Sequence, residues 1–155
     1  MLDWLQQLIR NPFLITGLSS WFVAQVLKTI LYAIIHKKIQ WERLIGDGGM
    51  PSGHSATVTS IATICMLGFG PGSFEFAISA ILAVIVCHDA MGVRRETGKQ
   101  SVVINEILDS FDALTKEQFS EVQLKEFVGH TPVQVMAGML IGILNALFLY
   151  FVIYK

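Results

Sequence analysis

The chain has 155 residues, about the length of one domain. Hydrophobic residues make up 53% of it and charged residues only 15%, and the mean hydropathy of +0.58 is too apolar for an ordinary soluble domain. The net charge of −1 gives no reason to expect a nucleic-acid partner. These values exclude most soluble classes and favour a protein embedded in a membrane.

The first two predicted elements are an interfacial helix and a membrane span. Residues 1–10 alternate apolar and polar residues and lack the features of a signal peptide. Residues 12–35 then form an apolar run of 24 residues that only Gln25 and Lys28 interrupt, which is long enough to cross a membrane. Lys28 either snorkels to the interface or faces a polar cavity inside the bundle.

A glycine-rich turn at 48–56 leads into the second helix, predicted over 54–69, which is short for a span. Such a turn exposes backbone N–H groups, and the helix after it directs the positive end of its dipole towards the turn. The turn therefore favours an anion such as phosphate, with Ser52 and Gly53 in the cradle and His54 at its edge.

The third helix is predicted over 74–93 and is followed by Arg94 and Arg95. Asp89 is costly near a membrane boundary unless it is paired, so we expect it to bridge Arg94 or a histidine. The polar segment 94–129 has apolar residues at helical spacing, which predicts an amphipathic helix on the membrane surface or on the bundle.

The last span is predicted over 131–154, 24 residues without a charge. Thr131 and Pro132 are typical of a helix start. Gly138 and Gly142 form a small-residue face that suits close packing, either within the chain or in a homodimer. The whole pattern predicts a single all-α membrane domain over 1–155, a bundle of about four transmembrane helices with amphipathic surface helices.

Basic residues predict the orientation of this multi-pass protein in the cell membrane. With four spans, one side holds both termini and two basic residues, whereas the other holds the two long connections and eight. The positive-inside rule then places the termini outside and the long loops in the cytoplasm. The eight are Lys37, Lys38, Arg43, Arg94, Arg95, Lys99, Lys116 and Lys125, and the two are Arg10 and Lys155.

His54 and His130 each begin a helix on the predicted cytoplasmic side, where Arg94 and Arg95 also arrive. Two histidines, several cations and two helix N-termini describe a phosphate site better than a metal site, which would need more ligands at defined spacing. We therefore expect neither a metal nor a cofactor. A nucleophilic serine is a weaker alternative, because nothing in the sequence resembles a hydrolase elbow.

Two motifs carry a family resemblance. Pro51-Ser52-Gly53-His54 and Gly129-His130-Thr131-Pro132, together with 89–95, resemble motifs of the type 2 phosphatidic acid phosphatase and vanadium-dependent haloperoxidase superfamily, and the chain is similar to its divergent branch. The resemblance implies that His130 attacks the phosphate to form a phospho-histidine and that His54 protonates the leaving alcohol. Both roles suit imidazole near neutral pH.

The motifs also depart from the family pattern. In the first motif only Arg43 is a suitable phosphate ligand, at a changed spacing from Lys37 or Lys38 and without the following proline. Leu124 and Gln134 hold the positions of the last motif's arginine and aspartate. Glutamine can orient the imidazole but cannot stabilise its positive charge. Arg94, Arg95 or Lys125 would have to replace the missing arginine in space.

Two functions follow from this pattern. The first is a membrane phosphatase-like protein that hydrolyses a phosphorylated lipid, as a phosphomonoester or diphosphate, at the cytoplasmic face. The alternative is a binding or transport protein for phosphate or a lipid phosphate that has lost catalysis, which Lys28, Gln25 and Gln134 favour. Either would work on a phosphate-bearing ligand at the membrane.

Overall fold

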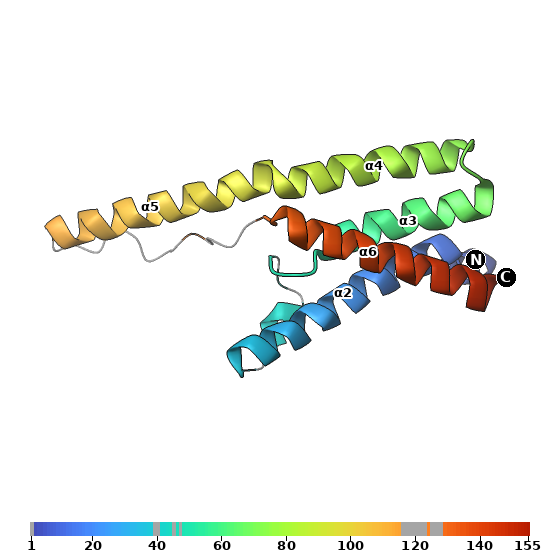
Figure 1. Cartoon of the computed structure of the whole chain (residues 1–155), viewed down its shortest axis with the longest axis horizontal. Helices are drawn as coiled ribbons and strands as arrows, with labels where there is room; N and C mark the ends of the chain where they lie inside the picture. The colour runs from blue at the N-terminus through green and yellow to red at the C-terminus, as the bar shows by residue number, and fades with distance from the viewer. Residues whose placement is uncertain (1, 39–40, 45, 47, 116–123, 125–128) are drawn as a thin grey trace.

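The computed structural model is built from helices (Figure 1). It describes residues 2–38, 41–44, 46, 48–115, 124 and 129–155, and within these residues there is no strand. The predicted all-α membrane bundle is therefore confirmed. The elements are α1 (Leu2–Ile9), α2 (Pro12–His36), the 3-10 helix η1 (Trp41–Leu44), α3 (Gly53–Phe69), α4 (Phe74–Met91), α5 (Val93–Thr115), α6 (Pro132–Phe148) and the π-helical continuation η2 (Leu149–Tyr154).

Helix α3 lies at the centre of the bundle, where it packs against α2, α4 and α6. Its contact with α6 depends on two glycines, because a Cβ on Gly138 would lie 2.3 Å from the carbonyl oxygen of Ser52 and one on Gly142 would lie 2.3 Å from that of Ala56. The small-residue face of α6 is thus used within the chain. A homodimer would have to form through another surface.

The interior of the bundle is rich in small polar residues. All but one of the largest fully buried side chains are hydroxyls; they are Thr16, Ser20, Ser52, Ser55 and Ser60, alongside Val135. The amide of Asn145 on α6 donates hydrogen bonds to the hydroxyls of Ser19 (2.9 Å) and Ser20 (2.8 Å) on α2. In a membrane, such residues let helices approach closely and bond across their contact, while large apolar side chains face the lipid. Exposed leucine, isoleucine and phenylalanine side chains cover the outer faces of α2, α4 and α6 accordingly.

Among the residues that the structure describes, three helical stretches are long and apolar enough to cross a membrane, namely Pro12–His36, Phe74–Phe111 and Pro132–Tyr154. Helix α3 has 17 residues, which correspond to about 25 Å at the usual helical rise. It is therefore shorter than a typical span, as its predicted length indicated, and the other helices surround it.

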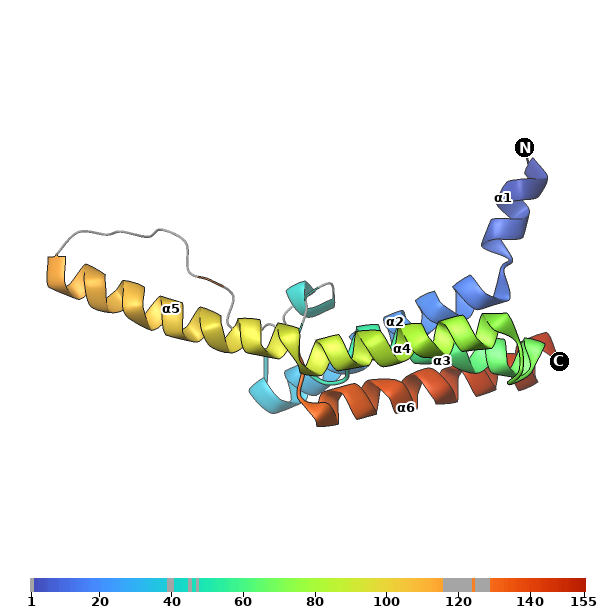
Figure 2. The ribbon, with the colours of Figure 1, turned by 90° about the horizontal axis from the view of Figure 1, so that it is seen from above.

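Helix α5 continues the direction of α4 away from the bundle (Figures 1 and 2). It is amphipathic, as predicted, but it does not fold back onto the bundle. Only its first turns lie near the other helices. Both termini and the 70–73 turn lie at the opposite end of the molecule from α5, where α1 bends away from α2 (Figure 2).

Candidate functional site

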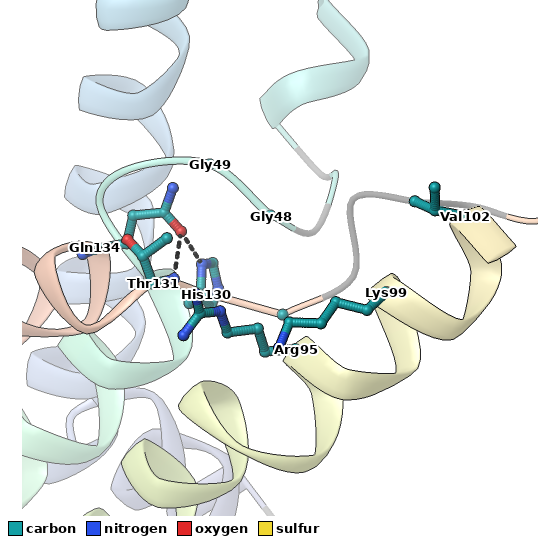
Figure 3. A pocket seen from close by; sticks show the side chains of 10 residues that line it. Gly48, Gly49, Arg95, Lys99, Val102, His130, Thr131 and Gln134 are labelled. Carbon is teal, nitrogen blue, oxygen red and sulfur yellow. Dashed lines mark hydrogen bonds between the residues drawn. The ribbon is translucent and has the colours of Figure 1, made fainter.

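A cavity of about 270 Å³ lies at the end of the bundle where α3 and α6 begin and α5 leaves it (Figure 3). The glycine turn, the start of α6 and the first turns of α5 form its walls. Its lining residues are Gly48, Gly49, Arg95, Gly98, Lys99, Val102, Gly129, His130, Thr131 and Gln134.

The backbone around His130 is anchored on the α4–α5 junction. The His130 N–H donates to the carbonyl of Ala90 at 2.9 Å, and Val135, one turn later, packs with Ala90 and Cys87 in the apolar core. The preceding Gly129 has φ +94°, and a Cβ there would lie 2.4 Å from the backbone nitrogen of Arg95. Only glycine lets the chain pass so close to α5, and this approach brings His130 beside Arg95.

Hydrogen bonds determine which ring nitrogen of His130 carries the proton. The side-chain oxygen of Gln134 lies 3.0 Å from the backbone nitrogen of Thr131 and 3.2 Å from His130 Nδ1 (Figure 3). A backbone N–H only donates, so the Gln134 atom facing both groups must be the acceptor oxygen. Nδ1 of His130 must then donate, and the neutral ring carries its lone pair on Nε2, which is the form that a nucleophile requires.

Gln134 also joins the two helix starts that form the pocket. Thr131 and Gln134 form a capping box at the start of α6, and the Gln134 carbonyl accepts the Ser52 N–H at 3.0 Å. The hydroxyl of Ser52 is buried and caps α3 by accepting from the backbone N–H (3.3 Å) and the hydroxyl (2.9 Å) of Ser55. The Ser52 hydroxyl is thus engaged in capping, and the pocket is lined without it.

Two cations enter the pocket from α5. Arg95 and Lys99 both line it, one helical turn apart, and Lys99 Nζ also bonds Glu96 Oε1 at 2.6 Å. Arg94 instead pairs with Asp89 outside the pocket at 2.9 Å, as predicted for Asp89. Arg43 belongs to η1, but its side chain lies outside the part of the chain that the structure describes.

The remaining predicted residues lie elsewhere. The side chain of His54 is exposed on the first turn of α3 and does not line the pocket. Gly53 is buried against Trp21, because a Cβ placed on Gly53 would lie 3.2 Å from Cδ1 of the Trp21 indole. Lys28 is only 4% exposed, and its Nζ donates to the Gly46 carbonyl at 3.3 Å, so it faces the interior rather than snorkelling.

The structure thus brings His130, Arg95 and Gln134 together and leaves His54 outside their pocket. Sequence reasoning missed Lys99 as a pocket residue. A usable signal was present, since Arg95, Lys99 and Val102 recur at the spacing of one helical face.

Comparisons with known proteins identify the family. A family model described as "Divergent PAP2 family" matches residues 9–145. The chain is 40% identical over 152 residues to the "Uncharacterized membrane protein YuiD" of Bacillus subtilis (strain 168), an alignment that covers 92% of this chain and 96% of that protein. No solved structure matches the chain significantly. The predicted resemblance to the divergent branch of the superfamily is confirmed, and this membrane protein belongs to the divergent PAP2 family.

Proposed function

We propose that the pocket binds the phosphate group of a phosphorylated lipid at the cytoplasmic face and hydrolyses it through a phospho-histidine on His130. The observation that carries this proposal is the buried imidazole of His130, oriented by Gln134 with Nδ1 as donor, in the same pocket as Arg95 and Lys99. A volume of about 270 Å³ is suited to a phosphorylated headgroup, while the apolar part of the ligand stays in the membrane.

The proposed reaction has two steps. The Nε2 lone pair of His130 attacks phosphorus, a P–N bond forms and the P–O bond to the leaving group breaks with its electron pair on oxygen. Water then attacks phosphorus, the P–N bond breaks, and phosphate is released with a proton returned to solvent. Arg95 and Lys99 would stabilise the charge on the phosphate oxygens in both transition states.

Protonation of the leaving oxygen bears on the choice of substrate. His54, the acid that the resemblance implies, is exposed and does not line the pocket. If the leaving oxygen takes its proton from solvent instead, a leaving group that is already stable as an anion is favoured. We therefore expect a lipid diphosphate, whose leaving group is itself a phosphate, to be hydrolysed faster than a lipid monophosphate.

The experiment measures phosphate release from lipid mono- and diphosphates by the purified protein in detergent and in vesicles. We expect His130→Ala to abolish release, because the nucleophile is lost, and His54→Ala to reduce it much less. Arg95→Gln should weaken release by about tenfold or more, through loss of a charged phosphate ligand. The exposed Arg94 is the matched control, and Arg94→Gln should leave release unchanged. Release that persists in His130→Ala would contradict the mechanism.

A second function rests on two specific observations: His54 is exposed, and the side chain of Gln134 that faces His130 Nδ1 is an uncharged amide. Both favour a site that binds a phosphate group without turning it over. In that case the wild-type protein would bind inorganic phosphate in a manner that depends on Arg95, and no phosphate would be released from any lipid at high protein concentration.

A further inference from the structure

A buried lysine contacts the glycine turn that forms one wall of the pocket. Gly48 and Gly49 line the cavity with φ values of +81° and +82°, a conformation that glycine adopts readily and that gains no support from side chains of its own. Some other part of the molecule must hold this turn in place. Lys28, in the second half of α2, contacts this turn.

Lys28 contacts the turn through both its stem and its charge. A Cβ placed on Gly49 would lie 3.6 Å from Cγ and from Cδ of Lys28, so the aliphatic stem packs directly against the turn. The Nζ atom donates to the carbonyl of Gly46 at 3.3 Å. Lys28 is only 4% exposed and is not a lining residue of the cavity. It therefore contacts the turn without lining the cavity.

A buried ammonium group is costly unless backbone or side-chain acceptors surround it. The carbonyl that accepts from Lys28 belongs to the same connection as Gly48 and Gly49. The position of the turn relative to α2 therefore depends on the ammonium group of Lys28.

We propose that Lys28 is a positioning residue for the phosphate pocket, which holds Gly46 and Gly49 against α2 so that the backbone of Gly48 and Gly49 can form the pocket wall. This inference rests on the proposed function for what the pocket binds, but the contact between Lys28 and the turn is separate from it. Lys28 acts through the backbone and does not itself touch the ligand.

The test compares Lys28→Met, which keeps the stem and removes the charge, with Lys28→Arg, which keeps a charged donor. Inorganic phosphate binding to the purified full-length protein is measured by calorimetry. Hydrogen–deuterium exchange is followed in peptides that contain Gly48 and Gly49. Lys38→Met is the control, because Lys38 is an exposed lysine just beyond the end of α2.

We expect Lys28→Met to weaken phosphate binding by about tenfold and to speed exchange in the turn, as expected for loss of a charged hydrogen bond. Lys28→Arg should restore both, and Lys38→Met should change neither.

A double-mutant cycle separates this role from a general loss of stability. Gly49→Ala strains the turn because of its positive φ, and its effect on phosphate binding should be smaller in the Lys28→Met background than in the wild type, since the turn is already released. Additive effects, or unchanged exchange in folded Lys28→Met protein, would overturn the proposal. Failure of the wild type to bind phosphate would instead contradict the proposed function, and exchange in the turn would still decide the role of Lys28.

Discussion

At the scale of single residues, Gln134 is the most informative position in the pocket. Its side-chain oxygen accepts hydrogen bonds from Thr131 and His130, and its carbonyl accepts one from Ser52. One residue therefore caps α6, orients the imidazole and ties α6 to α3. The uncharged amide orients His130 as a carboxylate would, but it supplies no negative charge to stabilise a developing imidazolium.

The tautomer of His130 is testable by NMR of ¹⁵N-histidine-labelled protein at a pH where the ring is neutral. We expect the wild type to carry its ring proton on Nδ1 and to have an unprotonated Nε2, because Gln134 accepts from Nδ1. Gln134→Glu should keep this preference and Gln134→Leu should abolish it, since leucine offers no acceptor. A wild-type signal from the Nε2–H form would contradict the assignment.

At the scale of elements, the pocket depends on how closely α3 and α6 approach each other. The two glycines of α6 meet backbone carbonyls of α3, so the separation of the helices is set by main-chain contact rather than by side chains. Ser52, one of these contacts, also donates to Gln134. A change in the α3–α6 distance is therefore transmitted directly to the residue that orients His130.

Gly142→Ala should destabilise the protein by about 1–3 kcal/mol, because the new methyl group would overlap the Ala56 carbonyl and separate the helices. Gly68→Ala on α3 is the matched control, since its Cβ would lie 3.9 Å from its nearest neighbour and alanine favours a helix. Thermal unfolding in detergent measures both. Equal unfolding temperatures for the two variants would show that the contact does not limit the approach.

At the scale of the whole molecule, the two ends of the bundle differ in composition. One end holds both chain termini and the 70–73 turn, and the other holds α5 (Figures 1 and 2), whose first turns line the pocket. Arg94, Arg95 and Lys99 belong to the pocket end, with Lys37 and Lys38 just after α2. This asymmetry supports the proposed orientation, in which the pocket opens towards the cytoplasm and its negatively charged ligand.

The orientation is tested by labelling single introduced cysteines with a membrane-impermeant maleimide on intact cells. Lys155→Cys should react from outside, and Lys38→Cys should react only after the membrane is opened, because the basic residues are retained in the cytoplasm. The parent protein is the control, since Cys65 and Cys87 are both buried. The reverse pattern of labelling would place the pocket on the outer face.

The sequence by itself determined the membrane class, the all-α fold, the helix start at Thr131 and the family, because apolar run length, capping residues and contiguous motifs are local properties of a chain. It also indicated the pairing of Asp89 with Arg94, which are neighbours in sequence. Local pattern was enough wherever the interacting groups lie within about two helical turns of each other.

Only the tertiary structure decided which residues share the pocket. The rotation of α3 about its axis leaves His54 exposed, the continuation of α4 into α5 brings Arg95 and Lys99 to His130, and the packing of α2 places Lys28 against the glycine turn. Each of these outcomes depends on helix rotation and packing between distant segments, which the periodicity of one helix does not specify. The proposed anion site was therefore indicated by local motifs, whereas the residues that line its pocket follow from how the helices pack.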